Sequence, residues 1–365
     1  MKNIVGLSLV ILWVSGAEAR PPQEAIDACR NVSDGSQCVI NTPRGKLTGT
    51  CRQPPHENQA VCIPANAGRP PMQNRGEQTS QSQGPQGRIR QHTTTQSDGH
   101  SHDVAATVQP SSANNMTVRI VGTDRVLQSN GVADHAVGRF PNQGNPNAIS
   151  AQNYQFRVPA QPQLAGRTTP LGMHDFGLAV NGVPFDPGAA EWYLGNRNGG
   201  WQYEPLSGAV PLGIDDNHAH VQPNGAYHYH GLPTLLLDKL TNSNQHSSLV
   251  GWAADGFPIY ALYGYQQTDN NQSSIIEMTS SYQLKTGSRP SSSGNPSGSF
   301  DGTFVEDYTY VSGSGSLDEC NGRITVTPEF PQGTYAYFLT ESWPVIPRCY
   351  KGTPSTDFTL QRARR

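Results

Sequence analysis

Glycine and proline interrupt this chain too often for long helices to be expected. The sequence contains 38 glycines and 29 prolines, and only 15% of its 365 residues are charged. Long amphipathic helices need more Leu, Glu, Lys and Ala than this composition provides. Short strands that are joined by turns fit the composition better. The sequence therefore predicts a mainly β fold with short strands, long loops and few helices.

The first 19 residues have the pattern of a signal peptide. Lys2 provides a positive charge, residues 4–14 form an apolar run, and residues 17–19 read Ala-Glu-Ala, a small-x-small cleavage pattern. The apolar run is shorter than the roughly 20 residues that a transmembrane helix needs. We therefore expect a secreted or periplasmic mature protein with no transmembrane segment after signal cleavage.

Six cysteines agree with export, because an even number of cysteines in a secreted chain indicates disulfide bonds. Four of them fall within residues 20–64: Cys29, Cys38, Cys51 and Cys62. A segment this short buries little apolar surface, so we expect a small module that two disulfides hold together. The sequence leaves open which of the three possible pairings forms. Cys320 and Cys349 are expected to form a third bridge.

The rest of the chain divides by composition into a linker, a main domain and a polar tail, at residues 65–113, 114–352 and 353–365. Polar residues, Gly and Pro dominate the linker, which buries too little apolar surface to offset its ordering entropy, so we expect it to be disordered. Apolar patterns in the main domain predict strands at residues 116–121 and 154–158 and a helix at residues 234–240. The formal net charge of -3 argues against a nucleic-acid partner.

The main domain contains two divergent copies of one pattern. Residues 177–185 and 251–259 each place an Asn-Gly or Asp-Gly turn between apolar segments. Farther along, an acidic pair is followed by a Tyr-x-Tyr motif in both copies, at residues 215–230 and 318–338. This order predicts two pseudo-symmetric halves that arose by duplication. Chance similarity within a glycine-rich chain is the alternative.

A group of four histidines lies in the first copy alone: His218, His220, His228 and His230. The second copy has Ala336 and Phe338 where the first has His228 and His230, so these histidines are additions to a shared scaffold. Residues two apart in a strand point to the same face, and residues 223–225 (Pro-Asn-Gly) form a turn signal. If a hairpin places His220 opposite His228, all four imidazoles share one face, with the tyrosines on the other. A shift by one residue separates the two pairs.

Imidazole nitrogens bind copper and zinc, and an exported protein meets both ions. We therefore predict a copper or zinc site at the four histidines named above. One further histidine and two carboxylates could complete or orient this site: His174, Asp175 and Asp216. The alternative is a metal-free network of hydrogen-bonded histidines and tyrosines. Asp255, in an Asp-Gly turn, is expected to be structural, whereas Asp318-Glu319 fits a turn cap and a cation ligand equally.

Three classes of function are compatible with these residues. The first is metal binding outside the cytoplasm, with the ion as the partner. The second is a metal-dependent enzyme, either an oxidoreductase with copper or a hydrolase with zinc, which needs an open coordination position. The third is a metal-free envelope module whose Tyr/His face recognises a protein or glycan that the sequence does not identify. No nucleotide-binding or nucleophile-elbow motif occurs in a suitable context.

Three blocks of the main domain resemble the signature blocks of the Tyr-His-Tyr-His (YHYH) domain family of exported bacterial proteins. These blocks are residues 224–231, 251–260 and 317–322, and residues 334–340 and 343–347 fit as well. The resemblance covers about residues 170–352. It implies export and the extent of the domain rather than a particular activity.

The resemblance also bears on individual histidines. The histidines of the family correspond directly to His228 and His230. His220 falls where the family tends to have a histidine after an acidic-Asn-Gly run, but that run here reads Asp-Asp-Asn-His-Ala-His. This departure leaves the role of His218 open. Residues 20–64 resemble a small cysteine-rich module that is appended to other bacterial secreted proteins.

Overall fold

A computed structural model describes residues 23–30, 32–33, 35–42, 45–53, 60–64 and 104–359. The expected signal peptide, most of the expected linker and the end of the expected tail lie outside these described residues. The described chain forms two compact units, one within residues 1–83 and the other within residues 84–365.

The N-terminal unit is a three-stranded antiparallel sheet with one short helix. Its elements are α1 (Gln23–Asp27), β1 (Gln37–Thr42), β2 (Gly45–Arg52) and β3 (Val61–Pro64), with β2 in the middle of the sheet. Disulfides join Cys29 to Cys51 and Cys38 to Cys62, which confirms the two expected bridges and identifies their pairing. The four buried cysteines make up most of a very small core. Crosslinks therefore stabilise this unit more than apolar burial does.

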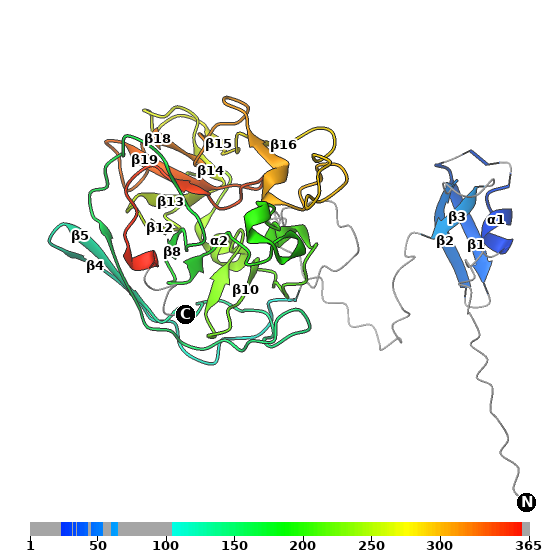
Figure 1. The fold of residues 1–365 in the computed structure, drawn as a ribbon, viewed down its shortest axis with the longest axis horizontal. Helices are drawn as coiled ribbons and strands as arrows, with labels where there is room; N and C mark the ends of the chain where they lie inside the picture. Colours follow the sequence, from blue (N-terminus) through cyan, green and yellow to red (C-terminus); the bar gives the residue numbers. More distant parts are fainter. Residues whose placement is uncertain are drawn as a thin grey trace, which may run out of the picture. The chain divides into compact units, whose positions relative to one another are not determined.

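The main unit is built on an eight-stranded mixed sheet (Figure 1). Its strands are β8 (Gly177–Ala179), β9 (Pro184–Phe185), β10 (Ala219–Val221), β11 (Tyr227–Tyr229), β12 (Gly251–Ala253), β13 (Pro258–Ala261), β18 (Gly322–Thr325) and β19 (Thr334–Leu339). Their order across the sheet is β10-β11-β9-β8-β12-β13-β19-β18. Neighbours are antiparallel except for β11 with β9 and β13 with β19. The short strands confirm the mainly β class that the glycine and proline content predicted.

The strand order is the same from either edge of this sheet. An outer hairpin (β10–β11 or β18–β19) pairs in parallel with an inner hairpin (β8–β9 or β12–β13), and the inner hairpins meet at β8 and β12. The central pair places Leu178 opposite Trp252, which are equivalent residues of the two sequence copies. The register of the parallel pairs also matches between the halves. The sequence repeat is therefore a repeat of structure, related by a pseudo-twofold axis between β8 and β12.

Smaller sheets and short helices complete the main unit. A three-stranded sheet contains β4 (Met116–Val121), β5 (Asp124–Ser129) and β6 (Tyr154–Pro159), and Figure 1 shows β4 and β5 as a long hairpin at the margin of the unit. The strand pairs are β7 (Thr169–Pro170) with β20 (Cys349–Tyr350), β14 (Tyr263–Tyr265) with β15 (Ile275–Glu277), and β16 (Tyr282–Leu284) with β17 (Tyr308–Tyr310).

The helices of the main unit are short. They are α2 (Thr234–Leu240) and the 3-10 helices η1 (Tyr193–Gly195), η2 (Arg197–Gly199), η3 (Pro205–Ser207) and η4 (Val305–Asp307). α2 has the predicted bounds and begins after Pro233, which is the residue before its first turn. The predicted strands at residues 116–121 and 154–158 are confirmed as β4 and β6.

The main unit includes residues on both sides of the expected limits, 114 and 352. Val104 and Val108 each form a β-bridge with the body of the unit. Near the other end, the ring of Phe358 stacks on Phe156 with the ring centroids 4.1 Å apart. Apolar side chains within segments of polar composition account for the difference, because each one buries surface against the main core.

The third disulfide joins Cys320 to Cys349, as predicted. Three disulfides together indicate an oxidising, extracytoplasmic environment. Within the part of the chain that the structure describes, no helix has the length and apolar character needed to cross a membrane.

Candidate metal centre

The outer hairpin of the first half carries the Tyr-His-Tyr-His motif. Its strands, β10 and β11, are joined by a turn in which Gly225 has a φ of 87°, a conformation that favours glycine. The register places His220 opposite His228, which is one of the two registers that the sequence left open. Tyr227 and Tyr229 are buried, and strand alternation places them on the opposite face of β11.

Three imidazoles converge on this hairpin. The Nε2 atom of His230 lies 3.1 Å from Nε2 of His228 and 2.9 Å from Nε2 of His220. The ligand atoms of all three residues lie within 4.8 Å of one another. Zinc–nitrogen bonds of about 2.0–2.1 Å place two ligands of a tetrahedral ion roughly 3.3 Å apart. The observed separations are slightly smaller, so a small outward movement of the rings would accommodate an ion.

Backbone carbonyls fix the orientation of two of these rings. Nδ1 of His220 donates to the carbonyl of Leu212 at 2.9 Å, and Nδ1 of His228 donates to the carbonyl of Ala226 at 3.1 Å. A carbonyl oxygen can only accept, so the neutral rings carry their protons on Nδ1 and present unprotonated Nε2 atoms. A carbonyl behind the ring is a common partner of a metal-ligating histidine.

The triad is largely buried, and burial keeps the imidazoles of His220 and His230 neutral. Burial lowers the pKa of His220 to about 4, although the Leu212 carbonyl acts in the opposite direction. Burial also lowers the pKa of His230 well below its ordinary value, and the adjacent imidazoles and Arg348 lower it further. The neutral imidazole is the form that binds a metal ion.

His218 lies outside the converging group. Its φ of 54° is in the left-handed region, so the ladder of β10 begins one residue later, at Ala219. Nδ1 of His218 donates to the carbonyl of Leu232 at 2.6 Å, and its own carbonyl accepts the N–H of His230 at 2.7 Å. The local turn therefore takes His218 off the face that His220 and His230 share, and its role as a ligand stays a prediction.

The three accessory candidates are placed elsewhere in the main unit. The carboxylate of Asp216 accepts the backbone N–H of Ala106 at 3.1 Å. Asp175 is fully buried next to His174, and its carbonyl accepts the hydroxyl of Tyr350 at 3.0 Å. Among the described residues, none of these three candidates belongs to a group of three or more side chains whose ligand atoms lie close enough together to hold a metal ion. Their predicted contributions to the site stay predictions.

Two polar residues near the triad were not identified from the sequence. Nε2 of Gln222, which is half-buried, lies 3.5 Å from Nε2 of His228. On the opposite face, the hydroxyl of Tyr229 donates to Nε2 of His135 at 2.7 Å and accepts from Asn181 at 2.9 Å. Gln222 could have been found, because it lies two residues after His220 in the hairpin. His135 is 94 residues from its partner, and no motif connects them.

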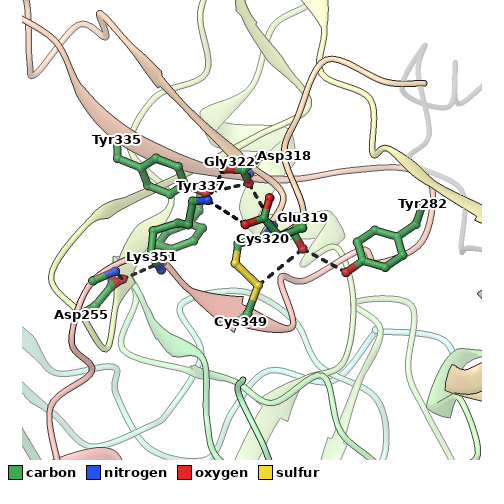
Figure 2. The surroundings of a disulfide bond; sticks show 11 residues. Asp255, Tyr282, Asp318, Glu319, Cys320, Gly322, Tyr335, Tyr337, Cys349 and Lys351 are labelled. Atoms are coloured by element: carbon green, nitrogen blue, oxygen red, sulfur yellow. Dashed lines mark hydrogen bonds and ion pairs between the residues drawn. A yellow bond between two sulfur atoms is a disulfide. The ribbon is translucent and has the colours of Figure 1, made fainter. Parts of the chain in front are cut away.

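The tyrosines have the same role in both halves. The hydroxyl of Tyr227 donates to the buried carboxylate of Asp215 at 2.7 Å. In the second half, Figure 2 shows the hydroxyl of Tyr335 beside Asp318, to which it donates at 2.9 Å. Tyr227 and Tyr335 therefore anchor their hairpins to acidic turns, which explains the presence of this tyrosine in both copies.

The acidic residues of the second half are structural. Asp255 accepts the hydroxyl of Tyr337 at 2.6 Å, as expected for a structural residue (Figure 2). Asp318 accepts the N–H of Cys320 at 2.9 Å and thereby caps its turn. Lys351 approaches Asp318 at 3.2 Å and Glu319 at 2.8 Å. The sequence left two roles open for Asp318-Glu319, a turn cap and a cation ligand. The contacts favour the turn cap, and the cation that the two carboxylates contact is the ammonium group of Lys351.

The fold and the site define a class of protein: a disulfide-bonded, mainly β protein of two related halves, with a buried histidine triad that could hold a metal ion. The YHYH protein family matches residues 155–352, more than half of the chain, and the chain belongs to this family. Two members of the triad, His228 and His230, come from the motif for which the family is named. A search of curated proteins and a search of solved structures found no match.

Proposed function

We propose that this protein binds copper or zinc outside the cytoplasm through His220, His228 and His230. The observation that carries the proposal is the convergence of three imidazole nitrogens, two of which have no proton to share. Lone pairs that face one another at 2.9 and 3.1 Å repel unless a proton or a cation lies between them. A cation satisfies all three nitrogens at once, whereas the His230 proton can be donated to only one neighbour at a time.

The proposed place of action is the periplasm or the extracellular medium. The expected signal peptide and the three disulfides support this location. Both copper and zinc are ions for which neutral imidazole is a suitable ligand, so the donor set alone does not select between them.

Metal content tests the proposal directly. The mature protein is purified without chelator, offered each ion, dialysed and analysed by native and elemental mass spectrometry, beside the His228→Ala/His230→Ala double variant. We expect nearly one ion per wild-type chain and none in the folded double variant. A third sample, His218→Ala, should keep the ion if three histidines form the site and lose it if His218 is the fourth ligand.

Absence of metal from the wild-type protein, after both ions have been offered, would contradict the proposal. The triad would then be a hydrogen-bonded network within a metal-free envelope module. Retention of the ion by the double variant would also contradict it, because the ion would be bound elsewhere in the chain.

A metal-dependent enzyme is the second candidate, and one observation favours it. Three histidines leave an ion with a coordination position that no protein ligand fills, which is typical of catalytic zinc sites. His220 and Gln222 are both partly exposed, so this side of the triad is accessible to solvent. Two assays test the candidate: ester hydrolysis by the zinc-loaded protein, and oxygen uptake with a reductant by the copper-loaded protein. Activity that His220→Ala abolishes would support it, and inactivity in both assays would favour binding alone.

A further inference from the structure

A second polar site lies in the other half of the main unit. A cleft of about 400 Å³ opens beside the β14–β15 hairpin. It is lined by Asn244, Gln245, His246, Tyr265, Asn271, Gln272, Ser273, Ile275 and Pro328. None of these described lining residues has a charged side chain. A cleft of this composition favours an uncharged ligand, because a charged ligand would lose its hydration without gaining a counter-ion.

The lining side chains offer both donors and acceptors of hydrogen bonds. Four primary amides contribute, and each can donate through its nitrogen and accept through its oxygen. The side chains of Asn244 and Gln245 are exposed and have no hydrogen-bond partner among the described residues. A Gln272–Asn271 amide pair, at 3.3 Å, faces the same cleft. Such a surface matches a ligand that has several hydroxyl groups.

His246 adds an acceptor that the protein does not satisfy. It is 8% exposed, and its Nδ1 donates to the carbonyl of Ser247 at 2.8 Å, so Nε2 of the neutral ring is an acceptor. Within the described chain, this Nε2 has no hydrogen-bond partner. Tyr265 provides an aromatic surface 4.8 Å from the His246 ring, centroid to centroid. An aromatic ring beside polar groups suits a molecule with one apolar face and a polar edge.

The position of the cleft within the repeat is informative. His246 packs on Phe338, the residue equivalent to His230, with the ring centroids 5.9 Å apart. Arg323, which is equivalent to His220, donates to the carbonyl of Tyr265 and lies over the Phe338 ring. The cleft therefore adjoins the positions that carry the histidine triad in the first half. The two halves place different chemistry at equivalent positions.

We propose that this cleft binds a neutral saccharide, an uncharged hexose or N-acetylhexosamine unit. Tyr265 lies against the apolar face of the sugar ring, and the amides of Asn244 and Gln245 bind its hydroxyl groups. Arg323 holds the backbone of Tyr265 and, through it, the position of the aromatic ring.

A second cleft in the main unit provides an internal control. It measures about 410 Å³ and is also rich in amides, with Gln128, Asn130 and Gln152 among its lining residues. Three of its amides are already engaged: Gln128 accepts from Arg119 at 2.5 Å, Asn130 donates to the carbonyl of Ala113 at 2.8 Å, and Gln152 donates to the carbonyl of Ser150 at 2.9 Å. The two clefts are thus nearly matched in size and polarity, and the amides to be substituted in the control cleft already bond within the protein.

Saturation-transfer NMR and calorimetry with the mature full chain test the proposal. The probes are four neutral tetrasaccharides, built of glucose with α or β linkages, mannose or N-acetylglucosamine, and one acidic tetrasaccharide of galacturonate. We expect at least one neutral probe to bind and the acidic probe not to bind. Tyr265→Ala should weaken binding at least about tenfold, as for an aromatic residue at the centre of a binding site. Asn244→Ala/Gln245→Ala should weaken it about three- to tenfold without affecting the fold, because both residues are exposed.

The control variants make the outcome decisive. Gln128→Ala/Gln152→Ala, in the other cleft, and His228→Ala/His230→Ala, in the triad, should leave saccharide binding unchanged. No binding of any neutral probe, a preference for the acidic probe, or binding that survives Asn244→Ala/Gln245→Ala would each overturn the proposal. The result is independent of whether the triad holds a metal ion, because the triad variant is tested separately.

Discussion

The two halves of the eight-stranded sheet share one backbone plan and differ at the positions where chemistry occurs. Backbone equivalence is detailed, because Asp215 and Asp318 begin matching turns. The backbone N–H of each aspartate donates to the carbonyl of the residue four positions later, Ala219 or Gly322, at 2.9 Å in both cases. On this shared plan, the first half has three imidazoles on one face of its hairpin. The second half has an arginine, an alanine and a phenylalanine there.

The difference teaches how the same scaffold can be stabilised in two ways. In the second half, Phe338 belongs to a buried apolar cluster with Tyr260 and Met278. In the first half, His230 is equally buried, and its Nδ1 makes no hydrogen bond of good geometry among the described residues, although the backbone of Asp186 is close enough to raise the pKa of the ring. A buried polar group without a partner destabilises a fold. The triad is thus expected to lower the free energy of unfolding, whereas the apolar cluster of the second half is not. Such a loss of stability is expected where residues serve binding rather than folding.

Substitutions at the two equivalent positions, 338 and 230, should show the largest effect. Phe338→Ala is expected to lower the free energy of unfolding by about 3–5 kcal/mol, because it leaves a cavity in a closed cluster. His230→Phe, measured with chelator present, should change it by less than about 1.5 kcal/mol, because an apolar ring replaces an unsatisfied one of similar size. Urea unfolding measures both. Equal destabilisation by the two variants would indicate that the triad is a structural network.

The comparison also shows what the sequence could predict. The paired turns and Tyr-x-Tyr motifs predicted the repeat, because it depends on local patterns that occur twice. The sequence left the His220–His228 register as one of two alternatives, and the structure selects it. The left-handed conformation of His218, the residue just before β10, was not predicted. Its equivalent, Asn321, has a φ of 52°, close to the 54° of His218. Asparagine adopts this conformation more readily than most residues, so alignment of the copies contained the signal.

Other features depend on contacts between residues that are far apart in the chain. The pairing of Cys29 with Cys51 follows from how α1 packs beside β3 and β1, which cysteine spacing does not determine. The cleft around His246 is formed by segments that precede β12 and follow β14, together with Pro328. None of these segments has a motif. Local patterns therefore predicted the halves and part of the triad, whereas long-range packing decided the rest.

The acidic turns allow a second test, which depends on pH. Asp215 is 2% exposed, and burial raises its pKa from 3.8 to about 6, although Tyr227 and three backbone N–H groups act in the opposite direction. Between pH 3.8 and about 6, the Asp215 carboxyl group keeps its proton in the folded protein and has lost it in the unfolded chain. The contribution of Asp215 to stability is therefore greatest below pH 4 and is lost as the pH rises through about 6.

Asp215→Asn should remove this dependence. The free energy of unfolding of the variant relative to wild type should increase by about 3 kcal/mol between pH 4 and pH 7, which corresponds to the shift in pKa. Asp318→Asn is the matched control, because the Asp318 side chain is 26% exposed and has Lys351 as a partner. Urea titrations at four pH values measure both differences. A wild-type-like pH profile for Asp215→Asn would show that the buried carboxyl group does not titrate in this range.

The smallest expected effect concerns the tyrosines, which the two halves have in common. Tyr227→Phe removes a donor from Asp215, which is enclosed, so the free energy of unfolding should fall by about 1–3 kcal/mol. Tyr335→Phe removes the matching donor from Asp318, which water can reach, so the loss should be nearer 0.5–1.5 kcal/mol, or about that of an ordinary hydrogen bond. Urea unfolding of the two variants at pH 7 measures the difference. If the two losses were equal, exposure of the carboxylate would not determine the strength of this contact, and the halves would be energetically as well as geometrically alike.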